Sequence, residues 1–266
     1  MKNSSTYEHD DFTLKEKLTY GIVGLVVLSG SFFIGRSIVR GARATSEQKK
    51  TYKDGNAAAF AQQEYVPRYD AFTGFSYLES PKLNLAERGF NGEFGVNVNR
   101  WLALGGDYSI FTGHSDITAA DLKSSLQLAL LPVLSSLPPG TVIALPFDST
   151  TYTFSAGPQF NFRQLKAFTF FVRPALGGMH ETATLKPSTP LLALLVQQLA
   201  PAGKKTDLEL FYGVGGGFDW NASKHLGLRV GVDFVHVNLF SDLLAEGRNS
   251  LRVSVGPTFR FGPNVP

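Results

Sequence analysis

The sequence contains no cysteine, and this absence excludes several classes of protein. Without thiols the chain cannot form a disulfide scaffold, a thiolate zinc site, an iron–sulfur cluster or a cysteine nucleophile. Charged residues are also scarce, at 18% of 266 residues, which is below the roughly 25% usual for soluble domains. The net charge of +3 is small and scattered along the chain, so we expect no nucleic-acid partner.

Aromatic residues and glycine are abundant in place of what is missing. The chain has 22 Phe and 27 Gly, and aromatic residues make up 12% of it. This apolar content excludes intrinsic disorder. Residues 1–67 and 68–266 differ in pattern, so we expect an N-terminal segment followed by one larger domain.

The N-terminal segment contains a candidate membrane-spanning helix over 18–39. Its uncharged part runs from Leu18 to Gly35, and these 18 residues meet the lower limit for crossing a bilayer. Arginines follow this stretch, whereas a secretory signal carries positive charges before its apolar core. We expect an uncleaved span or an atypical export signal, and a buried helix of a soluble protein is the alternative. The polar, alanine-rich residues 41–66 indicate a linker or a short helix.

The second part alternates apolar and polar residues with the two-residue period of a β-strand. We identify eight such segments, each close to the roughly 9–11 residues of a transmembrane β-strand. They cover 69–77, 90–98, 102–111, 152–162, 168–178, 208–220, 226–234 and 251–261. The predicted fold class is all-β, an eight-stranded antiparallel up-and-down transmembrane barrel.

The connections between these segments alternate in length. Three are short, at 99–101, 163–167 and 221–225, and the four between them are long, at 78–89, 112–151, 179–207 and 235–250. Short turns at one end and long loops at the other are typical of an outer-membrane barrel. Both ends of the barrel domain then lie on the short-turn side, which is periplasmic.

The two faces of the predicted strands differ in charge. One face is apolar, and the other carries ten charged residues: Asp70, Glu93, Asp107, Arg173, Glu209, Asp219, Arg229, Asp233, Arg252 and Arg260. An eight-stranded barrel has an interior just wide enough for side chains, so charges inside it must pair. We therefore predict a structural charge network that plugs the lumen, with a gated polar pore as the alternative. A soluble ligand-binding barrel would reverse the two faces.

Three prolines, Pro158, Pro174 and Pro257, lie inside predicted strands of a sheet that has no free edge. Each removes one hydrogen-bond donor from the ladder. We interpret them as bulges, because Pro158 and Pro257 also follow a glycine.

Residues 68–262 resemble the small OmpA-like outer-membrane β-barrel family. The likeness lies in the strand pairs GFNGEFGVNVNRWLALGGDYS (89–109) and FYGVGGGFDWNASKHLGLRVGVDF (211–234), and in LRVSVGPTFRFG (251–262). The resemblance implies an outer-membrane location and contact with outer-membrane lipid and lipopolysaccharide. We expect a monomer with a structural or surface-interaction role, which could bind a surface ligand through its long loops. Family members usually begin with a cleaved signal peptide, and residues 1–67 do not match one.

The sequence offers no strong catalytic, cofactor or metal site, so we expect no enzyme. His114-Ser115-Asp116 has the residue types of a catalytic triad, but a triad is defined by arrangement and not by adjacency. His180-Glu181, close to Glu209, is a weak candidate for metal or acid–base chemistry and is better interpreted as barrel rim. A lipid-directed enzyme or a carrier of small hydrophobic molecules remains the alternative function.

Two of the long loops contain apolar segments, Leu122–Leu137 and Leu191–Leu199, that we expect to form short helices. Full burial of one leucine is worth roughly 1.5–3 kcal/mol, so exposing all of their leucines to water would be costly. We therefore predict that the two helices pack together as a cap over the barrel mouth.

Overall fold

The computed structural model describes residues 65–134 and 144–265 of the chain. All of these residues fall within one compact unit, Ala58–Pro266, which contains the barrel. The expected helix over 18–39 lies outside the described residues. Among the residues described, no helix combines the length and the apolar character needed to cross a membrane.

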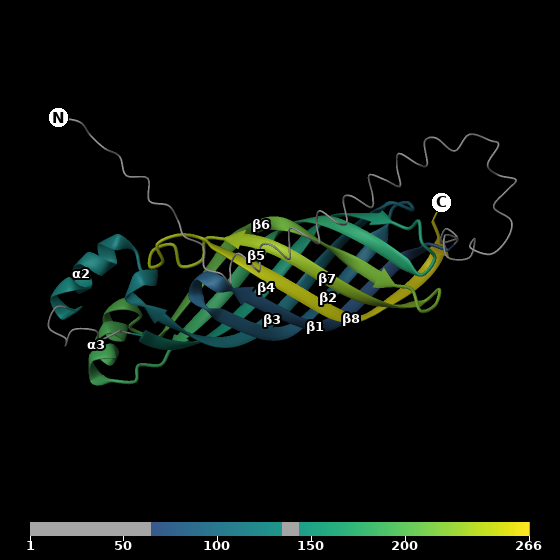
Figure 1. The fold of residues 1–266 in the computed structure, drawn as a ribbon. Coiled ribbons are helices and arrows are strands. Elements are labelled where there is room, and N and C mark those ends of the chain that lie inside the picture. Colours follow the sequence, from purple (N-terminus) through teal and green to yellow (C-terminus); the bar gives the residue numbers. More distant parts are fainter. Residues whose placement is uncertain (1–64, 135–143, 266) are drawn as a thin grey trace, which may run out of the picture. The chain divides into compact units, whose positions relative to one another are not determined.

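Eight antiparallel strands close into a barrel in which every strand pairs with its neighbours along the chain (Figure 1). The last strand pairs with the first, so the ring has no free edge. This confirms the predicted eight-stranded up-and-down barrel. The strands are β1 Pro67–Ser80, β2 Leu85–Asn97, β3 Leu102–Thr118, β4 Ala144–Phe162, β5 Phe168–Leu185, β6 Lys204–Trp220, β7 Leu226–Val237 and β8 Arg248–Asn264.

Several strands extend further toward the long-loop end than the sequence predicts. β4 begins at Ala144 instead of Tyr152, and β3 continues to Thr118 instead of ending at Phe111. These extensions pair residue by residue, for example Asp148 with His114 and Thr150 with Thr112. Because they carry polar side chains on the outward face, they lack the apolar alternation by which a strand is identified in sequence.

The apolar face of the sheet points outward and the charged face points inward. Phe94, Phe154 and Val255 are 50%, 52% and 43% exposed on the outside of the barrel. Arg229 and Arg252, on the inward face, are 2% and 3% exposed. A soluble barrel has the opposite arrangement, so the structure excludes that alternative and shows the surface of a membrane-spanning barrel.

The prolines of β4 and β5 do not form bulges, so that prediction is wrong. The pairs Ser155–Gly177 and Phe160–Val172 belong to one unshifted register, and in that register Pro158 lies opposite Pro174. The residues between these two pairs do not pair, because neither proline has an N–H to donate. Pro257 likewise sits in an unshifted register, opposite Leu228 of β7. One interruption of the β4–β5 ladder therefore accommodates two prolines at once.

An apolar core fills the interior near the long-loop end. It includes Leu85 of β2, Phe147 of β4 and Phe211 of β6, and Leu239, Phe240 and Leu244 from the β7–β8 connection join it. The 3-10 helix η2, Pro81–Leu83, adds Leu83. The backbone N–H of Phe240 donates to Asp207 Oδ2 at 2.5 Å, which ties the β7–β8 connection to β6. Side chains therefore close the interior at this end.

Two α-helices lie in the long loops, α2 Ser124–Leu134 and α3 Pro190–Leu199. Thr189 is the N-cap of α3, and its Oγ1 accepts a hydrogen bond from Leu192 N at 3.3 Å. Its buried Leu192 and Val196 pack on Leu145 and Leu185 at the strand ends. Leu128 and Leu131 of α2 remain 66% and 52% exposed. The described side chains thus show α3 packed on the barrel, and its packing against α2 stays a prediction.

Candidate functional site: the charged lumen

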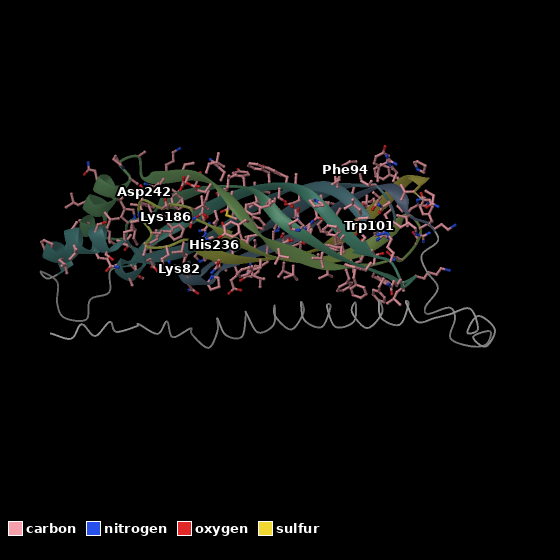
Figure 2. All side chains as sticks on the ribbon, turned by 90° about the horizontal axis from the view of Figure 1, so that it is seen from above. Lys82, Phe94, Trp101, Lys186, His236 and Asp242 are labelled. Atoms are coloured by element: carbon pink, nitrogen blue, oxygen red, sulfur yellow. The ribbon has the colours of Figure 1, made fainter. Side chains whose placement is uncertain are left out.

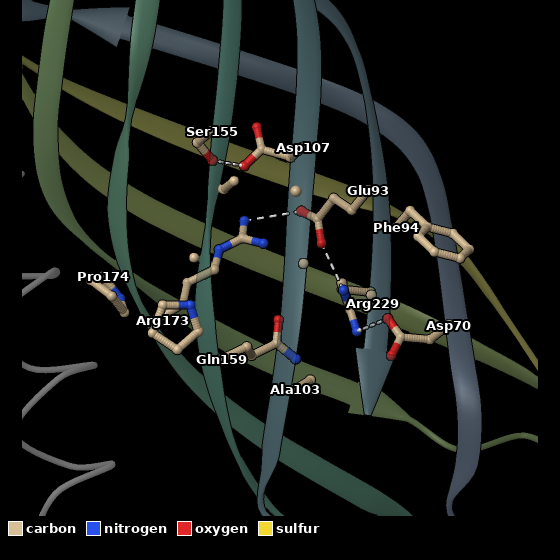
Figure 3. Close-up of a pocket in the computed structure, with 16 residues that line it drawn as sticks. Asp70, Glu93, Phe94, Ala103, Asp107, Ser155, Gln159, Arg173, Pro174 and Arg229 are labelled. Atoms are coloured by element: carbon tan, nitrogen blue, oxygen red, sulfur yellow. Dashed lines mark hydrogen bonds and ion pairs between the residues drawn. The ribbon is translucent and has the colours of Figure 1, made fainter. Parts of the chain in front are cut away.

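The middle of the lumen holds a network of arginines and carboxylates from opposite walls of the barrel (Figure 3). Arg173 of β5 lies 3.1 Å from Asp233 of β7 and 3.0 Å from Glu93 of β2, measured between side-chain nitrogen and oxygen. Arg252 of β8 reaches Asp107 of β3 at 2.7 Å and Asp233 at 2.8 Å. Arg173 therefore links β5 with β2 and β7, and Arg252 links β8 with β3 and β7.

The network continues toward the short-turn end through Arg229 of β7. Its guanidinium lies 2.7 Å from Asp219, 2.6 Å from Glu93 and 3.6 Å from Asp70. Arg260 of β8 adds a second contact to Asp219 at 2.9 Å. Glu93 thus accepts from both Arg173 and Arg229 and joins the two halves of the network (Figure 3).

Alternation along the strands explains why these charges meet. Every second residue of a strand points to the same side of the sheet, so charges two or four residues apart line one wall of the lumen. Asp107 shows how polar neighbours complete the network, because it also accepts a hydrogen bond from Ser155 Oγ of β4. The structure brings together nine of the ten charged residues named from the sequence: Asp70, Glu93, Asp107, Arg173, Asp219, Arg229, Asp233, Arg252 and Arg260.

Glu209 is the tenth residue, and the structure separates it from the others. It lies in β6 opposite Met179, toward the long-loop end, and is only half-buried. Its side chain forms no ion pair within residues 65–134 and 144–265. The prediction that Glu209 belongs to the lumen charge network is therefore wrong.

A second, smaller charge cluster lies closer to the long loops and was missed by the sequence analysis. Arg248 of β8 donates to Glu181 of β5. Glu87 of β2 accepts from Ser149 Oγ at 2.8 Å and from Thr151 Oγ1 at 2.9 Å. Glu87 and Glu181 are fully buried, and Arg248 is 2% exposed. This cluster therefore also belongs to the closed interior.

The predicted strands were too short to include this cluster. Glu87, Glu181 and Arg248 all lie beyond the strand ends expected at Phe90, Gly178 and Leu251. Parity contains the missing signal, because Glu87 is an even number of residues from Glu93, Glu181 from Arg173 and Arg248 from Arg252. The alternation of inward and outward residues, extended beyond the apolar part of each strand, places all three side chains in the lumen.

The weak chemical candidates do not form a site in the described residues. Glu181 points into the barrel, while His180 is directed to the other face, where its ring lies 6.0 Å from that of Tyr152. Ser115 Oγ donates to the carbonyl of Leu83 at 2.6 Å. No group of three or more His, Asp or Glu side chains suited to a metal ion occurs among the residues described.

The lumen contains a small polar cavity of about 30 Å³, shown in Figure 3. Asp70, Glu93, Asp107, Arg173 and Arg229 line it. Ligand pockets for small molecules usually measure about 300–1,000 Å³, so this cavity has room for water only. The volume and the charged walls do not suit a hydrophobic cargo.

Arg163 carries a further buried charge in the short turn after β4. Its Nη2 donates to Asn97 Oδ1 at 2.8 Å. Burial lowers the pKa of Arg163 to about 10. The guanidinium therefore still carries its positive charge at neutral pH.

Comparison with known proteins finds likeness in structure only. No protein-family model matches the chain, and no curated protein matches it. Similar solved structures include Ail, the attachment invasion locus protein of Yersinia pestis, at 15% identity and a TM-score of 0.42, covering 73% of this chain and 96% of that one. Neisserial surface protein A matches at 14% identity and 0.41, covering 73% and 96%. The outer membrane protein OprG of Pseudomonas aeruginosa matches at 11% and 0.43, covering 76% and 99%.

Proposed function

We propose that this small eight-stranded barrel is a non-enzymatic outer-membrane protein with a closed lumen and a structural or surface-interaction role. The observation that carries the proposal is the paired charge network across the lumen, from Asp70 near one end to Arg252 further along. The apolar core that includes Phe147 and Phe240 supports the same conclusion, because it fills the interior beyond the network.

The energetics favour a plug over a pore. Removing one partner of a buried ion pair typically costs 3–5 kcal/mol, because the remaining charge has no compensation. A pore that opened through this network would have to separate Arg173 from Glu93 and Arg252 from Asp107. The paired state therefore stabilises a closed interior that conducts weakly or not at all.

The exterior supports a place in the outer membrane. Phe94, Tyr108, Leu176 and Val214 are all about half exposed on outward-facing positions of different strands. An apolar exterior combined with a polar interior is the organisation of outer-membrane barrels. The surface fits outer-membrane lipid and lipopolysaccharide, with short turns in the periplasm and long loops outside. Because the ring has no unpaired edge, we infer a monomer.

The long-loop end supports a surface-interaction role over catalysis. Leu128 and Leu131 of α2 and Leu194 of α3 are exposed there, so this end presents apolar side chains that a ligand or partner could cover. A lipid-directed enzyme or carrier gains no support from the described lumen, since its cavity of about 30 Å³ is too small for a lipid chain.

Conductance in planar bilayers tests the closed lumen. We expect the purified, folded chain to produce no stable, large single-channel currents. A shift in gel migration on heating reports independently that the barrel is folded and closed. Folded protein that gives large, long-lived currents would contradict the plug.

A further inference from the structure

Among the described residues, the short turns of the barrel carry arginine and lysine but no acidic side chain. Each of these turns, and the start of β1, contributes at least one arginine or lysine. The exposed residues among them are Arg68, Lys166 and Lys224, which we call the cationic collar. Arg100 and Arg163 lie at the same end but are only half-exposed. The short-turn residues 65–68, 98–101, 163–167, 221–225 and 262–265 contain no aspartate or glutamate.

Neighbouring acids do not neutralise the collar. Asp70 and Asp219 are the carboxylates closest to it along β1 and β6, and both are buried in the lumen beside Arg229. Arg68, Lys166 and Lys224 are exposed. Their charges therefore face the surroundings of the barrel.

The opposite end of the barrel has a different charge pattern. Its described connections carry both signs, with Lys82, Lys123 and Lys186 set against Asp121, Asp242 and Glu246. Lys82 pairs with Glu246 at 3.3 Å, Lys205 with Asp242, and Lys186 with Asp148. Figure 2 shows Trp101 at the collar end and Lys82, Lys186 and Asp242 at the other. Within the described residues, three lysines at the long-loop end thus form ion pairs, whereas Arg68, Lys166 and Lys224 at the short-turn end form none.

Aromatic side chains border the collar on the outer surface. Trp101, which directly follows Arg100, is 56% exposed and stacks on Phe160 with 6.2 Å between ring centroids. Trp220, at the end of β6, is 48% exposed. Aromatic side chains of this kind occupy the headgroup level of a bilayer. The collar lies in the short turns, beyond these aromatic side chains as seen from the bilayer centre. Its charges then lie at the level of the lipid phosphates.

We propose that the cationic collar binds the phosphates of anionic phospholipids in the leaflet at the short-turn end. A lysine or arginine near an anionic lipid surface contributes about 1 kcal/mol, which corresponds to about a fivefold preference. The exposed ammonium groups of Lys166 and Lys224 suit phosphate, to which lysine binds as a point charge. This inference rests on the proposed membrane location.

The two tryptophans of the chain allow a direct test, since both lie beside the collar. The full chain is reconstituted in phosphatidylcholine vesicles that contain a fixed fraction of brominated phosphatidylglycerol or of brominated phosphatidylcholine. Bromine quenches tryptophan fluorescence on contact, so the ratio of the two quenching levels gives lipid preference at the collar. We expect a preference for phosphatidylglycerol of at least about fivefold at low salt, since each charge alone contributes that much, and little preference in 1 M salt, where the Debye length falls to about 3 Å.

Paired substitutions assign the preference to the collar. We expect the double variant K166Q/K224Q to lose most of the preference. The matched control K186Q/K205Q removes the same charge from the opposite end and should keep it. Heat-modifiable gel migration confirms that each variant is folded.

The possible outcomes separate this inference from the membrane proposal. Equal quenching by the two brominated lipids, or an unchanged preference in K166Q/K224Q, would overturn lipid binding by the collar while leaving the barrel in the membrane. Equal quenching together with sedimentation on peptidoglycan would assign the collar to the cell wall and also overturn it. Quenching by neither lipid would overturn the membrane location and the collar together.

Discussion

Glu93 and Arg229 are 136 residues apart in the sequence and form an ion pair across the lumen, with 2.6 Å between Oε2 and Nη1. Glu93 lies on β2 and Arg229 on β7, so the contact spans the interior and does not join neighbouring strands. Arg229 also lies 4.9 Å from the centre of the Phe171 ring. This one guanidinium therefore connects the charge network with the aromatic lining of the lumen.

Arg229→Met tests the contribution of that contact to stability. The change removes one of the two arginine partners from both Glu93 and Asp219, so we expect unfolding in urea to become easier by roughly 3–5 kcal/mol. Arg68→Met, at an exposed collar position, is the control and should change stability little. Equal stability of wild type and Arg229→Met would mean that the network does not hold the barrel together.

Val255→Arg tests the outward face. Val255 pairs with Val230 of β7 and Phe75 of β1 in the apolar exterior, so a charge there is costly in lipid. We expect a loss of roughly 2–4 kcal/mol in folding free energy measured in phospholipid vesicles. Thr112→Arg, placed on the polar outward extension of β3, should cost roughly 0–1 kcal/mol. A similar cost at both positions would contradict the placement of Val255 in the hydrocarbon and of Thr112 outside it.

Leu192→Asp tests how α3 is held. Leu192 is buried against Leu145, so a charge there should release the helix and increase proteolysis within residues 186–203. Leu194→Asp is the matched control, because Leu194 is 62% exposed on the same helix. If both variants are cut at the wild-type rate, the packing of α3 on the strand ends does not protect this loop.

Leu130→Asp tests the predicted packing of α2 against α3. If the two helices form one cap, this substitution in α2 should also increase cleavage in residues 183–207. Cleavage confined to α2 would show that the two loops act independently. The interaction-surface interpretation of the exposed leucines would then gain support.

Hydrogen exchange tests the interruption beside Pro158 and Pro174. Both prolines lack an amide hydrogen, and the ladder between β4 and β5 is broken between Ser155 and Phe160. We expect backbone amides there to exchange sooner than those of Ser109 and Thr153, which lie in the uninterrupted β3–β4 ladder. Uniform protection along β4 would show that the break is not a weak point.

The sequence predicted the strand number, the closed barrel and the direction of the side chains, because a two-residue period with one apolar face is a strong signal. Strand ends were less predictable. Asp148 and Thr150 continue β4 into a region that is polar on the outside, so the hydrophobic alternation ends before the hydrogen bonding does. The same limit hid Glu87 and Glu181.

Which charges pair could not be read from the sequence. Parity placed Glu93, Glu209 and Arg229 on the inward face, but pairing also depends on height along the tilted strands. Glu209 lies opposite Met179, above the middle network, whereas Glu93 and Arg229 meet. The register between distant strands sets these heights, and that register appears only when the ring closes.

The charge network also constrains how the barrel can enter a bilayer. Asp70 of the first strand pairs with Arg229 of the seventh, and Asp107 of the third strand pairs with Arg252 of the eighth. A sheet inserted strand by strand would carry Asp70 and Asp107 into hydrocarbon before Arg229 of β7 and Arg252 of β8 arrived to neutralise them. We therefore expect insertion to be cooperative, with β1 and β8 joined before or as the strands cross. The late strands then act as the counterions of the early ones, and a chain truncated before β7 should fail to enter the membrane.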